Sequence, residues 1–201
     1  MTVPPGYFDE MYAGSPDPWG FRHRWYELRK RAVTMAALPL PRYARAFEPG
    51  CSVGVLTAEL ALRCDSLVAG DPSEAAVVAT RAAVAGHSHV DVRQMCVPGD
   101  WPEGTFDLVV LSEVGYYLDG ADLATLLERC LTSLRGGATL LACHWRHVVV
   151  DYPSTGDNVH RVLGDSPDLH RFVHHLEEDF VLDGWSLGRT PSVARREGLV
   201  G

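Results

Sequence analysis

Apolar residues in the middle of the chain alternate between strand-like and helix-like spacing. Continuous or alternating apolar runs predict strands at 43–50, 66–71, 90–95, 106–114 and 138–145. Three- and four-residue apolar spacing predicts helices between them, at 55–64, 72–86 and 122–137. This alternation is typical of a parallel sheet covered by helices. We therefore expect an α/β fold with a doubly wound, mostly parallel sheet of about seven strands.

The two ends of the chain follow other patterns. Residues 1–20 are rich in Pro, Gly and aromatic side chains, so we expect an ordered arm without a long helix. Residues 22–37 predict a helix with Trp25, Leu28, Ala32 and Met35 on one apolar face. The pattern then predicts an irregular stretch at 146–166, a helix at about 167–179, and strands at 180–187 and near 192–198.

We interpret the chain as one domain, residues 1–201. In this interpretation residues 1–38 are an aromatic arm and helix that act as a lid, 39–145 bind a cofactor, and 146–201 supply a substrate loop and the closing elements.

A glycine-bracketed bend joins the first predicted strand to the helix that follows it. Gly50 and Gly54 flank the bend, and glycine lets backbone amides approach a ligand closely. The following helix directs free N–H groups at the same place. Ser52 stands where a dinucleotide fingerprint has its middle glycine, so the bend alone is equally compatible with a tight strand–helix corner.

Asp71 ends the second predicted strand, about 20 residues after the bend, where a carboxylate can accept both hydroxyls of a ribose. It can also cap the helix that begins at Pro72, and the two roles are compatible. Together, the bend and the carboxylate indicate a cofactor that contains adenosine.

Several segments carry a family resemblance. FEPGCSVG (47–54), AGDPS (69–73), FDLVVLSEVGYYL (106–118) and LRGGATLLACHW (134–145) resemble the class I S-adenosylmethionine-dependent methyltransferases, which have a Rossmann-like sheet. With DPW (17–19) and YELRK (26–30), the order of segments over about residues 7–147 resembles the nodulation protein S group. Those enzymes N-methylate an amino sugar at the end of a chitin-like oligosaccharide.

The resemblance implies a set of contacts with S-adenosylmethionine. The methionine part would meet the bend and the acid before it: Glu48, Gly50, Cys51, Ser52 and Gly54. The ribose and adenine would meet Asp71, Pro72, Gln94, Met95 and Cys96. Ser112 and Glu113 would lie near the sulfonium, while Trp19 and Arg29 would close over the cofactor, with Arg29 a candidate for its carboxylate. Many relatives have aspartate where Cys96 stands, so we expect Gln94 or a backbone carbonyl to accept from the adenine amino group.

Transfer from a sulfonium mainly requires alignment of the nucleophile and exclusion of water. His144 ends a predicted strand and titrates near neutrality, so it is the leading candidate for a base, with a hydrogen-bonded strand-end histidine as the alternative. Glu113 is a rival base, an anchor for a cationic amine, or a structural contact. Tyr116 can offer a hydroxyl to the acceptor, or pack in the core.

Candidate acceptor contacts come from the arm, the end of the fourth predicted strand and the stretch after residue 145. They are Tyr7, Tyr12, Tyr117, Trp145, Arg146, His147, Asp151, Asp157 and His160. The two aspartates suit sugar hydroxyls or an ammonium, whereas Arg146 and His147 suit an anion, so the charge of the acceptor stays open.

Composition removes some function classes. The net charge of −8 and pI of about 5.5 argue against a general nucleic-acid binder. No run is long and apolar enough for a membrane span, and the start lacks the pattern of a signal peptide. Five dispersed cysteines suggest reduced thiols in a cytoplasmic protein. Lys30 is the only lysine, which we read as genome composition. His170, His174 and His175 share a predicted helix without an H-E-x-x-H frame, so we expect no metal.

The leading hypothesis is therefore a methyltransferase that uses S-adenosylmethionine on a small polar acceptor, with the amine of an amino sugar or aminoglycoside-like metabolite favoured. An O-methyltransferase on a hydroxylated or acidic metabolite is an alternative. Outside this class stand a nucleotide-binding Rossmann oxidoreductase and a catalytically silent binding subunit. The sequence leaves the oligomeric state open, with a homodimer as one option.

Overall fold

The computed structural model describes residues 1–200 and contains a seven-stranded sheet in the order β3-β2-β1-β4-β5-β7-β6. The strands are β1 Ala46–Pro49, β2 Leu67–Asp71, β3 Val90–Gln94, β4 Phe106–Ser112, β5 Leu134–Trp145, β6 Leu169–Leu176 and β7 Phe180–Leu187. The helices are α1 Pro5–Gly14, α2 Trp25–Ala36, α3 Val55–Ala61, α4 Glu74–Ala83, the 3₁₀ turn η1 Gly115–Tyr117, α5 Gly120–Ser133, α6 Gly156–Gly164 and α7 Val193–Arg196.

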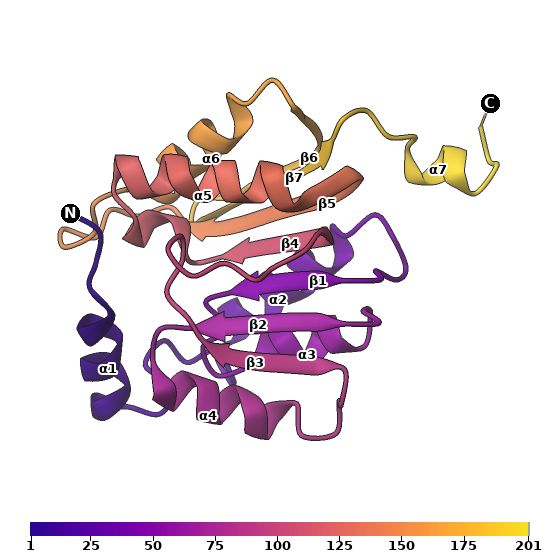
Figure 1. Ribbon diagram of the computed structural model, residues 1–201. Helices are drawn as coiled ribbons and strands as arrows, with labels where there is room; N and C mark the ends of the chain where they lie inside the picture. The colour runs from indigo at the N-terminus through magenta and orange to yellow at the C-terminus, as the bar shows by residue number, and fades with distance from the viewer. Residues whose placement is uncertain (201) are drawn as a thin grey trace.

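Strands β1 to β5 pair in parallel, whereas β7 runs antiparallel to both β5 and β6. The predicted doubly wound, mostly parallel sheet is confirmed. The strand order reverses between β1 and β4, and open α/β sheets bind their ligands beyond the strand ends at such a point. Figure 1 shows α1 at the edge where the parallel strands end, with α7 at the far side of the molecule.

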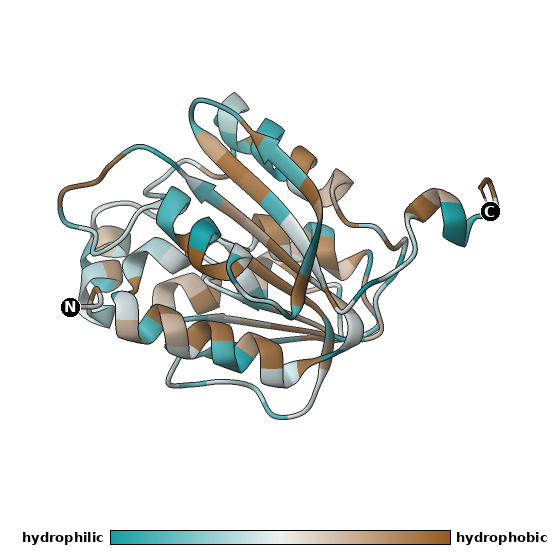
Figure 2. Cartoon of the chain, turned by 90° about the horizontal axis from the view of Figure 1, so that it is seen from above, coloured by the Kyte–Doolittle hydropathy of each residue, from teal (hydrophilic) through white to brown (hydrophobic). Residues whose placement is uncertain are grey.

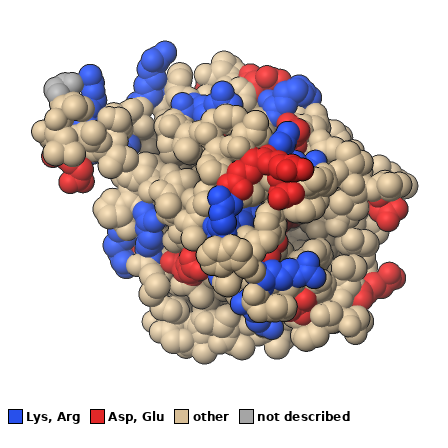
Figure 3. Space-filling view, turned by 180° about the vertical axis from the view of Figure 1, so that it is seen from behind, with Lys and Arg blue, Asp and Glu red and all other residues tan. Residues whose placement is uncertain are grey.

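Each face of the sheet has its own core, because the strands alternate their side chains between the faces. Phe47 packs on one side with residues of α5 and α6, such as Leu126 and Leu163. Ala46 packs on the other side with Leu60 of α3. Apolar strands covered by amphipathic helices are visible in Figure 2. Over the face drawn in Figure 3, acidic and basic side chains are interspersed and form no field of one sign.

Four predictions about the chain ends are wrong. Residues 5–14 form a helix, since the prolines stand at its start, where the missing N–H costs nothing. Residues 156–164 of the supposed irregular stretch form α6. The predicted helix at 167–179 is the edge strand β6, because half of its residues face solvent and its polar side chains blurred the two-residue period. The last predicted strand, near 192–198, contains the short helix α7.

Helix α2 forms as predicted, but a different face of it is buried. Trp25 is 75% exposed, while the buried residues are Glu27, Lys30 and Thr34. Apolar spacing misidentified the inner face because that face lines a cavity instead of the core. Within residues 1–200, no helix is long and apolar enough to cross a membrane.

Candidate active site

A cavity of about 620 Å³ lies at the carboxyl ends of β1, β2 and β4. Its walls come from segments far apart in the chain: the arm, α2, the bend after β1, the end of β4, η1 and the loop after β5. The predicted site residues that line it are Tyr12, Trp19, Glu48, Gly50, Cys51, Ser52, Asp71, Pro72, Met95, Cys96, Ser112, Glu113, Tyr116, Tyr117 and Trp145.

The glycine bend is shaped to bring backbone close to this cavity. Gly50, Ser52 and Gly54 all have φ between 50° and 77°, the left-handed region. A Cβ at Gly50 would lie 2.4 Å from a methyl of Val114, so the bend is packed against the end of β4. The Gly50 and Cys51 amides donate to the Gly70 carbonyl at 2.6 and 2.9 Å, which ties the bend to β2.

Asp71 links the bend to the start of α4. Its two carboxylate oxygens accept from the backbone amides of Ser52 at 2.9 Å and Ser73 at 3.0 Å. It is 5% exposed, and burial raises its pKa to about 6 even though both amides favour the charged form. Each oxygen keeps a second lone pair, so Asp71 can hold the bend and still accept hydroxyls from a ligand.

Glu48 is a buried acid with an unused acceptor. It is 2% exposed, lines the cavity, and its Oε2 has no hydrogen-bond partner among the residues described. Burial raises its pKa to about 8. An unpartnered buried carboxyl is costly unless a ligand completes it, so an ammonium group of a bound molecule fits this place.

The N-terminal arm contacts both ends of the cavity. The Tyr12 hydroxyl is hydrogen-bonded to Ser52 Oγ at 2.6 Å, and its ring packs edge-on against Trp19. At the other end, the Val3 amide donates to the Tyr117 carbonyl at 2.9 Å. The arm therefore covers the bend and reaches η1.

Lys30, the only lysine of the chain, projects into the opposite part of the cavity. Its Nζ lies 2.6 Å from Glu113 Oε1 and 2.9 Å from Glu27 Oε2, and it sits over the ring of Tyr26. Burial opposes its charge, yet the two carboxylates hold the pKa of Lys30 above its ordinary value. Reading this lysine as genome composition missed the only buried ammonium that the side chains of residues 1–200 supply.

Glu113 accepts from three donors of the protein. Besides Lys30, its carboxylate accepts from the Tyr116 hydroxyl at 2.6 Å and the Trp145 amide at 2.9 Å. Its φ of 58° is unusual for a residue with a side chain and directs the carboxylate toward α2. These contacts are those of a structural residue that joins α2, η1 and β5, which is the third of the roles that the sequence allows for Glu113, beside a base and an anchor for a cationic amine.

His144, the leading candidate for a base, does not reach the cavity. It is 0% exposed, and its two ring nitrogens contact the Gly115 amide and His160. Burial lowers its pKa well below the ordinary value. The residue lies beneath η1 because the side chains of β5 alternate, and Trp145, the next residue, is the one that lines the cavity.

Other expected contacts also lie elsewhere. Arg29 points outward to a bidentate pair with Glu177, Gln94 donates to the Pro72 carbonyl, and Gly54 caps α3 behind the bend. Arg146 pairs with Asp157, and His147 with Asp179. Asp151 is exposed, His160 is buried, and Tyr7 packs its hydroxyl against Tyr152 beside the cavity.

Sequence reasoning also missed several residues of the lining. Arg24, Tyr26, Glu27, Lys30, Tyr152 and Asp179 all line the cavity. The Tyr26 hydroxyl is buried without a partner among the described residues, so it is available to a ligand. Within residues 1–200, no group of three His, Cys, Asp or Glu side chains could hold a metal ion, and the three histidines of the supposed helix lie on β6.

Comparison with known proteins places this cavity in a family. A model described as nodulation protein S (NodS) matches residues 10–153. Nodulation protein S of Rhizobium tropici is 34% identical over 133 residues, 62% of this chain and 53% of that protein. Nodulation protein S of Sinorhizobium fredii is 32% identical over 66% of each chain. The chain thus spans about half to two thirds of the length of these relatives.

Solved structures agree. A crystal structure described as a putative methyltransferase from Pseudomonas syringae is 48% identical, with a TM-score of 0.73 over 81% of this chain and 99% of that one. The N-methyltransferase NodS from Bradyrhizobium japonicum, in complex with S-adenosyl-L-homocysteine, is 20% identical, with a TM-score of 0.81 over 92% and 98% of the two chains. At that identity the second likeness concerns the fold, which is the class I methyltransferase fold.

Proposed function

Since the chain belongs to the nodulation protein S (NodS) family, we propose that it is an S-adenosylmethionine-dependent methyltransferase that N-methylates an amino sugar or a related aminoglycoside-like metabolite. One observation carries the cofactor assignment: the glycine bend, Asp71 and the unpartnered Glu48 line one cavity. The bend and Asp71 are joined directly by the 2.9 Å bond from the Ser52 amide.

The side chains present fit this cofactor. Glu48 offers its unused oxygen to the methionine ammonium, and Asp71 offers its remaining lone pairs to the ribose hydroxyls. Met95 and Cys96 supply an apolar wall for the adenine. For the carboxylate, Arg24 takes the place expected of Arg29: it lines the cavity, and no acceptor among the described residues bonds its guanidinium.

The acceptor end supports an amine. S-adenosylmethionine supplies an electrophilic methyl carbon on its sulfonium. A neutral amine attacks through its lone pair and needs no base in the transition state, whereas a hydroxyl must lose its proton during attack. Glu113 lines the cavity, but its carboxylate already accepts from three donors, and His144 lies outside the cavity, so neither favoured base is free to take a proton from an acceptor. The chain's contribution is then to orient the acceptor against aromatic walls and exclude water.

Calorimetry with S-adenosylhomocysteine tests the cofactor half of this proposal. We expect one molecule bound per chain, and an affinity roughly 100-fold weaker in Asp71→Ala, because two bonds to a charged group are removed. Asp91→Ala is the matched control, since this exposed aspartate lies one strand away and pairs only with Arg93. If the wild-type chain bound no S-adenosylhomocysteine, the proposal would be overturned.

A panel of amino sugars and their hydroxyl-only analogues tests the acceptor. We expect methylated product from the amines, located on nitrogen by mass spectrometry and NMR. Turnover of hydroxyl or carboxyl acceptors alone would keep the methyltransferase and discard the amine.

A further inference from the structure

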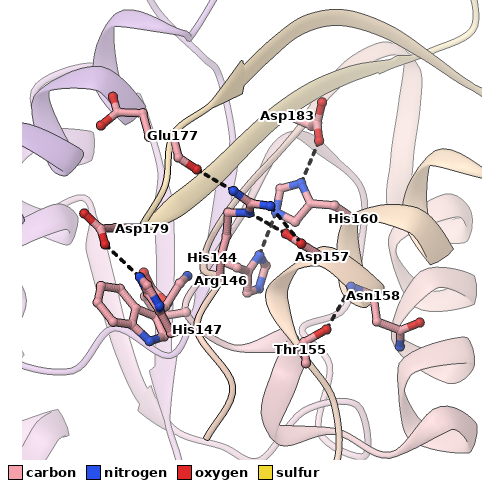
Figure 4. Close-up of polar contacts among 12 residues, drawn as sticks. His144, Arg146, His147, Thr155, Asp157, Asn158, His160, Glu177, Asp179 and Asp183 are labelled. Atoms are coloured by element: carbon pink, nitrogen blue, oxygen red, sulfur yellow. Dashed lines mark hydrogen bonds and ion pairs between the residues drawn. The ribbon is translucent and has the colours of Figure 1, made fainter.

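A hydrogen-bonded network of buried polar groups, the His–His–Asp network, lies behind the wall of the cavity and extends from η1 to the outer strand β6. His144 of β5, His160 of α6 and Asp183 of β7 are 0%, 7% and 1% exposed. Figure 4 shows the three side chains pointing toward one another across the three elements. Burying so many polar groups is costly unless each is satisfied, so the arrangement needs an explanation.

The Gly115 amide, at one end of the His–His–Asp network, fixes the direction of every hydrogen bond in it. The Gly115 amide donates to His144 Nε2 at 3.0 Å, so that nitrogen carries no proton. His144 Nδ1 therefore carries the proton and donates to His160 Nε2 at 3.0 Å. His160 Nδ1 in turn donates to Asp183 Oδ2 at 2.7 Å. Both rings are held as the Nδ1–H tautomer.

The outer end of the His–His–Asp network is the buried carboxylate of Asp183. Burial opposes the ionisation of Asp183, but hydrogen bonds from His160 and His174 hold its pKa below the ordinary value. Its Oδ1 is 2.8 Å from His174 Nδ1 and 3.5 Å from Arg171 Nη1, and both of these side chains reach solvent from β6. The carboxylate thus remains an acceptor for His160.

The inner end of the His–His–Asp network contacts η1, whose residues Tyr116 and Tyr117 form the cavity wall on the acceptor side (the acceptor wall). A Cβ at Gly115 would lie 2.6 Å from Val159 Cγ1 and 3.2 Å from His144 Nε2, so only glycine lets the η1 backbone sit against α6 and the ring. The next residue, Tyr116, donates to Glu113 and stacks on Tyr152. The position of the Gly115 amide therefore determines the position of Tyr116 and of the acceptor wall.

We propose that His144, His160 and Asp183 are positioning residues, which hold η1 by the Gly115 amide and thereby set Tyr116 and Tyr117 against the acceptor. The proposal rests on the methyltransferase function proposed above. It excludes His144 as the base, because both of its ring nitrogens are occupied and it does not line the cavity. A histidine suits this place because one rigid ring can accept at one end and donate at the other.

Two amide substitutions separate the two ends of the ring. In His144→Gln, the side-chain oxygen can reach the place of Nε2 and still accept from Gly115, while in His144→Asn the nitrogen replaces Nδ1 and the Gly115 amide is left without a partner. We expect His144→Asn to lower kcat for the acceptor by about tenfold or more, and His144→Gln to restore most of it. His89→Gln is the control, since His89 contacts the Ala61 carbonyl away from the cavity.

Three readouts decide the outcome. The affinity for S-adenosylhomocysteine should change less than about threefold in both variants, because the His–His–Asp network contacts the acceptor wall and does not contact the glycine bend. Equal kcat values in folded His144→Gln and His144→Asn would overturn the proposal. Nitrogen NMR of the histidines in the wild-type chain tests it without any variant: His144 with its proton on Nε2 would overturn it even if one variant failed to fold. Failure of the wild type to bind S-adenosylhomocysteine would instead count against the proposed function.

Discussion

The two ends of the cavity are built in different ways. The cofactor end comprises Glu48, the bend 50–54 and Asp71, which come from two adjacent parallel strands and the turn after the first, and it is held together largely by backbone amides. The acceptor end comprises Lys30, Glu113 and the tyrosines of η1, which act through side chains from separate elements. A backbone cradle depends on local conformation, whereas a side-chain cluster depends on how distant elements pack.

Breaking the acceptor end at its centre should give the largest effect. Lys30→Met removes the ammonium between two carboxylates and leaves Glu27 and Glu113 buried without a cation. We expect the free energy of unfolding to fall by about 3–5 kcal/mol, measured by urea denaturation. Arg81→Met is the control, because its pair with Glu74 is exposed. A loss no greater than in the control would mean that the cluster is not buried in solution.

The cofactor end should respond to pH through Glu48. Its pKa is raised from an ordinary 4.5 to about 8, so the unfolded chain ionises first, and stability present below pH 4.5 is lost as pH rises to about 8. The Glu48→Gln side chain cannot ionise, so the stability of this variant relative to wild type should rise by about 2–4 kcal/mol between pH 5 and pH 9. Thermal unfolding at a series of pH values measures this difference. A constant difference across that range would contradict the raised pKa.

The same group predicts proton release when the cofactor binds. Below pH 8 the wild-type carboxyl is protonated when the cavity is empty, and a ligand ammonium favours its ionised form. Calorimetry of S-adenosylhomocysteine at pH 7 in buffers of different ionisation enthalpy should therefore show release of up to about one proton per chain. Glu48→Gln should abolish the release and weaken binding.

A smaller change tests the shape of the bend. Gly50→Ala places a Cβ 2.4 Å from Val114 at a φ of +73°, so we expect about 2 kcal/mol of destabilisation and a marked loss of S-adenosylhomocysteine affinity. At Gly86→Ala the added Cβ has no neighbour within 4 Å, so that variant should keep its affinity. Equal affinities in the two variants would show that the bend does not meet the cofactor.

The smallest effect is expected at Arg29. Its pair with Glu177 is exposed, with the Arg29 side chain 43% accessible, and water and salt screen such pairs, so they contribute little to stability. Arg29→Ala should leave S-adenosylhomocysteine binding unchanged, while Arg24→Ala should weaken it. The reverse ranking would restore the expectation from sequence that Arg29 holds the carboxylate.

The same contrast explains which parts could be predicted. The parallel strands, the bend and the acid at residue 71 carry local patterns, and they lie where those patterns placed them. Lys30 and its partners lie in segments that carry the family resemblance, but no local pattern indicates that they meet, because residues 27, 30 and 113 come together only in the folded chain. His144 was misplaced for a related reason: the pattern located the end of β5, but not which of two neighbouring residues faces the cavity.

The solitary lysine also makes the chain a convenient reporter of its own opening. An endoproteinase specific for lysine has one bond to cut in these 201 residues, the bond after Lys30, and Lys30 is 5% exposed. Cleavage requires that α2 detaches or the whole chain unfolds, so its rate reports the population of these open states when they close again faster than they are cut. The rate at which the two fragments appear on a gel, with and without each candidate ligand, would then measure how much that ligand stabilises the closed state.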